Sequence, residues 1–266
     1  MVKRFLYLIL ILFAFQFISC SKYQKLLKSN DNNEKFERAI TYYDHGDYYR
    51  AQQLFDQLIN VYAGTDKVEK INYYYAYSYF KQDDYITASY YFKQFAKKFP
   101  NSKFAEECAY MSAYCQYMDS PKYNLDQTNT TESIKEFQLF INAYPQSERI
   151  PKCNELMDKL RGKLELKSFE TAKLYFKMED YKAAITTFNN VLRDFPDTPH
   201  KEEIMFDIIK ANYKYAIKSI ESKKKERYQA AIEAFDSFIS AYPESSYLNQ
   251  ANIMQKNSLK FIKNYF

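Results

Sequence analysis

The sequence is poor in glycine and histidine and contains no tryptophan, and these shortages exclude several kinds of site. Three glycines in 266 residues leave no Gly-rich loop that could cradle a phosphate. Neither His45 nor His200 lies at metal-ligand spacing from Cys108 and Cys115, and no Ser-His-Asp order is apparent. We therefore expect no cofactor, no metal site and no catalytic residues, so the protein is not expected to be an enzyme.

Cysteine is also scarce, with four in the chain. Cys108 and Cys115 are seven residues apart on one predicted helix, a spacing that no disulfide spans without unwinding the helix. We interpret these two, with Cys153, as buried core thiols.

The charge balance is only weakly basic. The formal net charge is +5, and it falls to +3 if Lys3 and Arg4 are removed with a signal segment. Without a continuous basic face, this small excess predicts no nucleic-acid partner.

A repeated pattern is the main feature that the sequence does contain. It reads Tyr-x-x-Ala-x-x-x-Phe, with another aromatic seven residues further on and then proline. The clearest copy is Tyr181, Ala184, Phe188, Phe195 and Pro196. The related copies, one of which lacks the proline, begin at Tyr48, Tyr85, Thr130 and Tyr228. These positions lie on one face of a helix, so each copy predicts an amphipathic helix that proline ends.

A partner helix precedes three of these copies, with Ala and Tyr three residues apart and a short acidic turn between the two helices. The pairs are Ala39 and Tyr42, Ala76 and Tyr79, and Ala172 and Tyr175. A Ser or Thr two residues after each proline is interpreted as the N-cap of the next helix: Ser102, Ser147, Thr198 and Ser245. This order of residues resembles the tetratricopeptide repeat.

That resemblance implies an all-α superhelical solenoid of about five helix-turn-helix repeats. We expect one repeat domain over 34–266, closed by a capping helix at 246–264. The repeats are expected near 34–62, 69–100, 102–145, 150–196 and 199–243. The stretch 150–178 is expected to be one long helix, weakly broken at Gly162.

The N-terminus predicts a lipoprotein. A short basic segment precedes an apolar run from Phe5 to Phe17 that is too short to span a membrane, so 1–19 is interpreted as a signal peptide. The run ends in Ser19-Cys20, which resembles the bacterial lipobox, with Phe17 where leucine is usual. That resemblance implies diacylglycerol and an N-acyl chain on Cys20. We interpret 20–33 as the lipidated cysteine and a polar tether.

The third predicted repeat contains a long loop, Asp119 to Asn129, between its two helices. Lipobox, tether, five repeats and the sequence Leu125-Asp126-Gln127-Thr128 within this loop together resemble the BamD family of the outer-membrane β-barrel assembly machinery. The resemblance implies a non-catalytic scaffold anchored in the outer membrane and facing the periplasm. Its implied partners are BamA, other assembly-complex subunits and unfolded outer-membrane β-barrel proteins.

The resemblance to the tetratricopeptide repeat implies that the first helices of repeats one and two line a concave face. The candidate groove residues are Phe36, Tyr43, Lys70, Tyr73, Tyr74 and Tyr77. An aromatic groove with one cation suits an extended apolar peptide that ends in an aromatic carboxylate. The same rings could instead pack between helices, and the sequence leaves both interpretations open.

Two further segments are candidate partner-docking loops. One is Leu125, Asp126 and Gln127; the other is the basic run containing Lys223, Lys224 and Arg227, expected between the helices of repeat five. A solvated charge run is the alternative for the second. Other lipid-anchored repeat adaptors, such as a secretin pilot protein or a glycan-uptake lipoprotein, remain alternatives. Glycan-uptake lipoproteins usually carry tryptophan platforms, which this chain lacks.

Overall fold

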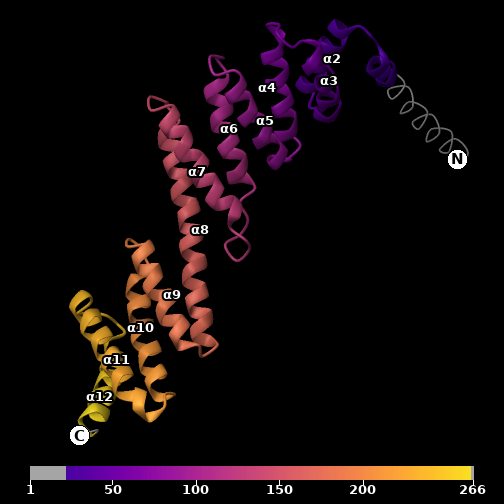
Figure 1. The fold of residues 1–266 in the computed structure, drawn as a ribbon. Helices are drawn as coiled ribbons and strands as arrows, with labels where there is room; N and C mark the ends of the chain where they lie inside the picture. Colours follow the sequence, from indigo (N-terminus) through magenta and orange to yellow (C-terminus); the bar gives the residue numbers. More distant parts are fainter. Residues whose placement is uncertain (1–21, 265–266) are drawn as a thin grey trace, which may run out of the picture. The chain divides into compact units, whose positions relative to one another are not determined.

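The computed structural model describes residues 22–264, and within that range every regular element is a helix. From residue 32 on, the helices pair into five helix-turn-helix repeats followed by a last helix, which confirms the predicted fold class (Figure 1). The pairs are α2 (Asn32–Asp44) with α3 (Tyr48–Val61), α4 (Lys67–Phe80) with α5 (Tyr85–Lys98), α6 (Ala105–Met118) with α7 (Thr128–Ala143), α8 (Ile150–Lys177) with α9 (Tyr181–Asp194), and α10 (Lys201–Ile217) with α11 (Glu221–Ala241); the last helix is α12 (Leu248–Asn264).

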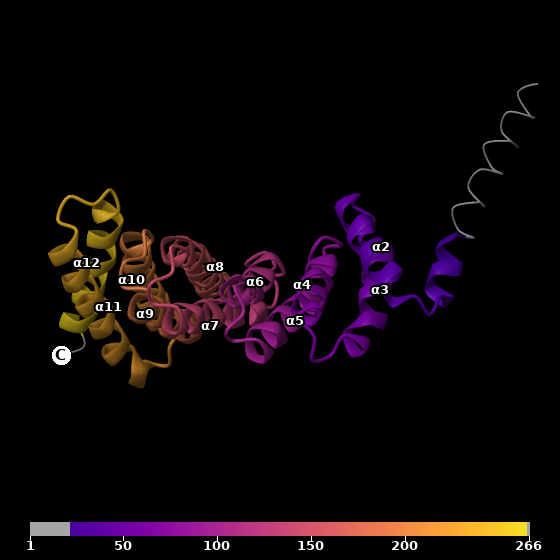
Figure 2. The same ribbon diagram turned by 90° about the horizontal axis from the view of Figure 1, so that it is seen from above.

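The chain divides into two compact units. The described part of unit 1 is 22–121 with 128–157, and that of unit 2 is 122–127 with 158–264, so α8 contributes residues to both. In unit 1 each helix from α2 to α7 packs against the next one in the sequence, and in unit 2 the same holds from α9 to α12. Helices α4 and α5 of unit 1 lie side by side in both views (Figure 1, Figure 2), as the short turn between them requires.

The repeated small and aromatic residues form the contacts between helices. The small residue of each repeat is at most 1% exposed: Ala51, Ala88, Ser133, Ala184 and Ala231. The aromatic four residues later is at most 3% exposed: Phe55, Phe92, Phe137, Phe188 and Phe235. A neighbouring helix can approach closely only where the side chain is small, and the ring fills the adjacent space. The repeat pattern is thus a packing pattern.

The turns inside three repeats share one geometry. A residue with positive φ is followed by an aspartate that caps the next helix, in the pairs Gly46-Asp47, Asp83-Asp84 and Glu179-Asp180. Each cap carboxylate accepts a hydrogen bond from the backbone N–H three residues on, at 3.1 to 3.3 Å. This satisfies one of the N–H groups that a helix start leaves without a partner.

The Ser and Thr residues after the prolines do not cap helices directly, so their interpretation as N-caps is wrong. Each hydroxyl accepts a hydrogen bond from the backbone N–H two residues on, at 3.1 to 3.2 Å; the four acceptors are Ser102, Ser147, Thr198 and Ser245. The helices begin three residues after them. These side chains stabilise a turn between repeats, because a hydroxyl bonds to its own local backbone as readily as to a helix end.

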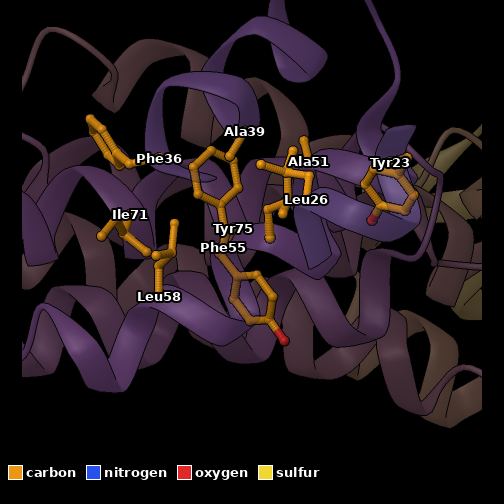
Figure 3. Close-up of a cluster of buried hydrophobic side chains, with 10 residues drawn as sticks. Tyr23, Leu26, Phe36, Ala39, Ala51, Phe55, Leu58, Ile71 and Tyr75 are labelled. Carbon is orange, nitrogen blue, oxygen red and sulfur yellow. The ribbon is translucent and has the colours of Figure 1, made fainter. Parts of the chain in front are cut away.

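The segment predicted as a tether is partly folded. Residues 22–28 are helical, and Tyr23 and Leu26 are buried in the core of unit 1 (Figure 3). The Tyr23 hydroxyl donates a hydrogen bond of 2.7 Å to Gln53 Oε1, and the Arg50 guanidinium lies 5.2 Å from the Tyr23 ring. Tyr23, Leu26 and Leu27 lie three and four residues apart, which is the spacing of one apolar helix face. The repeat domain therefore begins earlier than residue 34.

Helix α8 runs without a break through Gly162, contrary to the weak break predicted there. Leu156 and Leu160 of this helix are buried. In unit 2, one core gathers Phe169 and Phe188, and a second gathers residues of α10, α11 and α12 around Phe238. One glycine does not break a helix whose other residues pack well, since it costs only about 1 kcal/mol.

Candidate functional site

The predicted groove residues come together on α2 and α4 of unit 1. Lys70, Tyr73, Tyr74 and Tyr77 lie three or four residues apart on α4, so they share adjoining faces of that helix. Tyr43 of α2 reaches this set, because its ring centroid lies 4.7 Å from that of Tyr74 in an edge-to-face arrangement. We call these five residues the tyrosine face.

Two residues of the next repeat complete this arrangement, and the sequence did not indicate them. The Phe104 ring lies 4.4 Å from the Tyr73 ring. Glu107 Oε1 accepts hydrogen bonds from the hydroxyl of Tyr73 at 3.2 Å and from that of Tyr77 at 2.5 Å. Both residues lie at the start of α6 in repeat three, so only the register between neighbouring first helices could have pointed to them.

The rings of the tyrosine face pack between helices and remain partly exposed. Tyr73 contacts Phe95, and Tyr77 lies 4.8 Å from Phe92, both in the core contributed by α5. The two interpretations that the sequence left open therefore do not exclude each other. Each of the four tyrosines packs against neighbouring rings and keeps part of its side chain exposed.

Burial and the Glu107 carboxylate act on these hydroxyls in the same direction. Burial, followed by the charge of Glu107, raises the pKa of Tyr73 to about 12. Burial and the hydrogen bond to Glu107 raise the pKa of Tyr77 well above its usual range. Both hydroxyls thus remain protonated and donate hydrogen bonds at neutral pH.

Phe36 does not belong to an open groove, which corrects the prediction for this residue. It is 6% exposed and lies in the core of unit 1 with Leu58 and Ile71 (Figure 3). Lys70 is exposed, and its ammonium lies 5.8 Å from the ring centroids of both Phe36 and Tyr74. The cation thus covers the buried ring and forms one border of the tyrosine face.

The loop of repeat three is present at 119–127, and its three candidate residues differ in role. Leu125 is 53% exposed. Gln127 is buried, and its Nε2 donates to the backbone oxygens of Lys122, Leu125 and Asp126 at 2.8 to 3.3 Å. Gln127 therefore holds the loop together instead of offering its amide to a partner. Asp126 contributes a backbone acceptor to this arrangement.

The basic run of repeat five lies in the first turns of α11 and not in a loop, so that prediction is wrong. Lys223 pairs with Glu226 at 3.0 Å, and Lys224 pairs with Glu221. The Arg227 guanidinium lies 3.7 Å from the centroid of the Tyr215 ring. Lys223 and Lys224 are thus paired within α11 itself, whereas Arg227 donates a hydrogen bond to Ser219 Oγ outside the helix.

The cysteines of the described chain agree with their interpretation as core thiols. Cys108, Cys115 and Cys153 are all free and buried. Burial raises the pKa of Cys115 to about 12 and that of Cys153 to about 11, so neither is a thiolate at neutral pH.

Cys20, the predicted lipid attachment site, lies outside the described residues. Of the helices at 22–264, none combines the length and the apolar character that a bilayer crossing requires.

Two protein-family models match parts of this chain. Residues 28–227 match the YfiO family model, described as outer membrane lipoprotein, and residues 218–245 match a tetratricopeptide repeat model. The first match spans repeats one to four and part of repeat five, so it includes the tyrosine face and the loop of repeat three.

Three curated relatives carry the name outer membrane protein assembly factor BamD, in one case as putative. The putative factor of Aquifex aeolicus is 27% identical over 72% of this chain and 63% of its own length. The Caulobacter vibrioides protein is 24% identical over 44% of this chain and 38% of its own, and the Rickettsia prowazekii protein is 21% identical over 66% and 70%. The chain thus matches less than two thirds of the length of the first two relatives.

Proposed function

The chain belongs to the YfiO family of outer membrane lipoproteins, and from this premise we propose that it is a non-catalytic subunit of the β-barrel assembly machinery. In this proposal it is anchored through acyl chains on Cys20 and faces the periplasm. It docks on BamA and helps to receive unfolded β-barrel proteins. Three relatives named as assembly factors support this proposal.

The observation that carries the receiving role is the tyrosine face with Lys70 at its border. Partly exposed rings supply apolar contact at low entropic cost, because each tyrosine has few rotatable bonds. Lys70 has no carboxylate within salt-bridge distance among the described residues, so its charge is available to a ligand. A peptide that ends in an aromatic residue would place its ring on the face and its terminal carboxylate near Lys70.

A peptide-binding measurement tests the receiving role. The probe is a labelled peptide with the last strand of a barrel protein, ending in phenylalanine, and its binding to the full chain in neutral-lipid nanodiscs is followed by fluorescence anisotropy. We expect the free acid to bind more tightly than its C-terminal amide, and Lys70→Glu to remove that difference. Lys182→Glu, an exposed lysine in unit 2, is the matched control.

Affinity purification tests the docking role separately. A C-terminally tagged copy is extracted from membranes in mild detergent, and its partners are identified by mass spectrometry. Recovery of BamA as the dominant partner is the expected result. Recovery of a secretin or of a glycan transporter in its place would refute membership of the assembly machinery while leaving the fold intact.

A further inference from the structure

A second site lies in unit 1 between the second helices of repeats two and three. It is a pocket of about 290 Å³ bordered by α5, α6 and the start of α7. Its lining includes Tyr85, Ile86 and Tyr90 from α5, and Gln116, Asp119 and Glu132 from the other two elements. It thus combines apolar surface with carboxylates, whereas the tyrosine face lies on α2 and α4.

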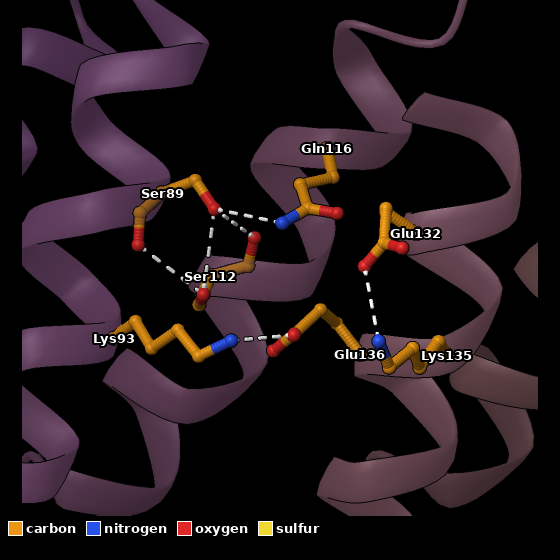
Figure 4. A network of polar contacts seen from close by, with 7 residues as sticks. All are labelled: Ser89, Lys93, Ser112, Gln116, Glu132, Lys135 and Glu136. Atoms are coloured by element: carbon orange, nitrogen blue, oxygen red, sulfur yellow. Dashed lines mark hydrogen bonds and ion pairs between the residues drawn. The ribbon is translucent and has the colours of Figure 1, made fainter. Parts of the chain in front are cut away.

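The floor of this pocket contains an acceptor without a partner. Gln116 Oε1 is buried and accepts no hydrogen bond from the described residues, while Gln116 Nε2 donates to Ser89 Oγ at 3.4 Å. Ser89 Oγ itself donates to the Ser112 backbone oxygen at 2.9 Å, so its proton is not available to Gln116. The amide oxygen is directed away from Ser89, to the side on which Glu132 lies (Figure 4).

The charge around this acceptor is negative. Among the described residues that line the pocket, Lys93 is the one cation, and it is neutralised by Glu136 at 2.6 Å (Figure 4). Asp119 accepts a hydrogen bond from the neutral amide of Asn129, which leaves its charge in place. Glu132 pairs only weakly, because Lys135 lies 3.5 Å away and both side chains are largely exposed. A cationic ligand is therefore favoured over a neutral or anionic one.

The apolar residues at the rim of the pocket indicate which kind of ligand the cation belongs to. Ile86 is 70% exposed and Tyr90 is 58% exposed, so an apolar surface continues from the pocket onto α5. An isolated small cation would leave that surface uncovered, whereas a polypeptide would cover it with the residues beside the cation.

We propose that this pocket receives an arginine side chain of a partner polypeptide. The guanidinium donates hydrogen bonds to Gln116 Oε1 and to the Glu132 carboxylate and stacks on the Tyr90 ring. A planar group with several donors can make these contacts together, which a lysine ammonium cannot. An apolar residue beside the arginine packs on Ile86. A small rotation of the Gln116 amide opens the buried oxygen to the incoming donor.

The test uses fluorescein-labelled Leu-Arg-Leu amide and the full chain in neutral-lipid nanodiscs, with binding measured by anisotropy at low and at moderate salt. We expect measurable binding that weakens with salt, since charged contacts are screened. The citrulline analogue keeps the shape and loses the charge, and it should bind roughly tenfold more weakly. Equal binding of the two peptides would refute a cation site, as would a failure of the arginine peptide to bind.

Variants locate the binding. The double substitution Glu132→Gln and Tyr90→Ala should weaken binding of the arginine peptide roughly tenfold. The control Glu244→Gln changes an exposed glutamate in unit 2 and should leave binding unchanged. Gln116→Met should weaken binding and leave the melting temperature unchanged or higher, because it removes an acceptor that has no partner. Unchanged affinity in the first variant would place the peptide elsewhere and overturn the proposal.

Competition by arginine amide distinguishes the source of the guanidinium. If the ligand is a polypeptide, arginine amide alone should compete at concentrations well above those of the tripeptide, because it lacks the flanking contacts. If it competes as well as the tripeptide, the pocket is a small-molecule site and the polypeptide partner is refuted.

Discussion

Tyr73, Tyr77 and Glu107 show how one set of residues serves packing and surface together. Both hydroxyls donate a hydrogen bond to Glu107 Oε1, and Glu107 belongs to the next repeat. Without them the carboxylate would lose two charge-assisted hydrogen bonds at a partly buried position. The same rings form most of the tyrosine face, so substitutions there have to separate the two roles.

Phenylalanine at both positions should lower stability while keeping the rings. We expect Tyr73→Phe and Tyr77→Phe to cost about 1 kcal/mol each, because each removes one hydrogen bond to a charged group that is only partly screened. Urea unfolding measures this. Glu107→Gln, which keeps an acceptor, is the matched control and should cost less than the double variant. A double variant as stable as the parent would show that these bonds contribute nothing.

The raised tyrosine pKa values predict a loss of stability in alkali. The pKa of Tyr73 rises from 10.0 to about 12 on folding, so the folded state favours the protonated hydroxyl. This contribution is complete below pH 10 and is lost as the pH rises through 12. Urea midpoints between pH 9 and pH 12 should therefore fall, and they should fall less steeply for the double phenylalanine variant than for the parent.

At the scale of the helix, the same substitution should act with opposite sign at two glycines. Gly162 lies inside α8, Gly46 has a φ of +79°, and an added Cβ at either position meets nothing within 4 Å. Gly162→Ala should stabilise by about 0.5–1 kcal/mol, because it removes conformational freedom from the unfolded chain. Gly46→Ala should destabilise by about 1 kcal/mol, because a Cβ disfavours positive φ. Urea unfolding measures both changes in stability. A change of the same sign in the two variants would show that backbone conformation does not decide the effect.

The cap of α9 offers a second test at this scale. Asp180 accepts a hydrogen bond from the Ala183 N–H at 3.1 Å. Asp180→Ala should cost about 1 kcal/mol in urea unfolding, and Asp180→Asn, which keeps an acceptor oxygen, should cost much less. Equal losses would show that the negative charge, and not the hydrogen bond, stabilises this helix start.

The helices could be predicted because their signals are local. Proline after an aromatic, a small residue at the helix contact and the acidic turn all act within one repeat, and the helix bounds follow them closely. The predictions failed where the outcome depends on a distant partner. Tyr23 and Leu26 looked like a tether because their core is supplied by repeat one. The run at Lys223 looked like a loop because its ion pairs become visible only once α11 is formed.

The candidate site shows the same division. The spacing of Tyr73, Tyr74 and Tyr77 placed them on one helix, and this is confirmed. Burial of Phe36 and the contribution of Glu107 depend on how neighbouring first helices are aligned, which no local pattern encodes. Gln127 was predicted to dock a partner, but its amide donates hydrogen bonds to the backbone of its own loop.

At the scale of the whole molecule, the proposed anchor predicts where the protein is found. Cys20→Ala removes the acceptor for the proposed acyl chains. We expect this variant to lose palmitate labelling and to leave the outer-membrane fraction, either as a released protein or as an uncleaved precursor. Ser21→Ala, which keeps Cys20, is the matched control. Normal labelling of the Cys20 variant would refute lipidation at that position.

The three buried thiols link the folding of this protein to chemistry in its surroundings. Folded, they are protonated and inaccessible, so oxidants and other cysteines do not reach them. Outside the cytoplasm, where disulfides form readily, any copy that unfolds exposes all three to thiol–disulfide exchange. A disulfide formed in that state would prevent the repeats from closing around the cysteines again. In the proposed location, rapid folding would therefore protect the chain from such a disulfide, because the folded core buries all three cysteines.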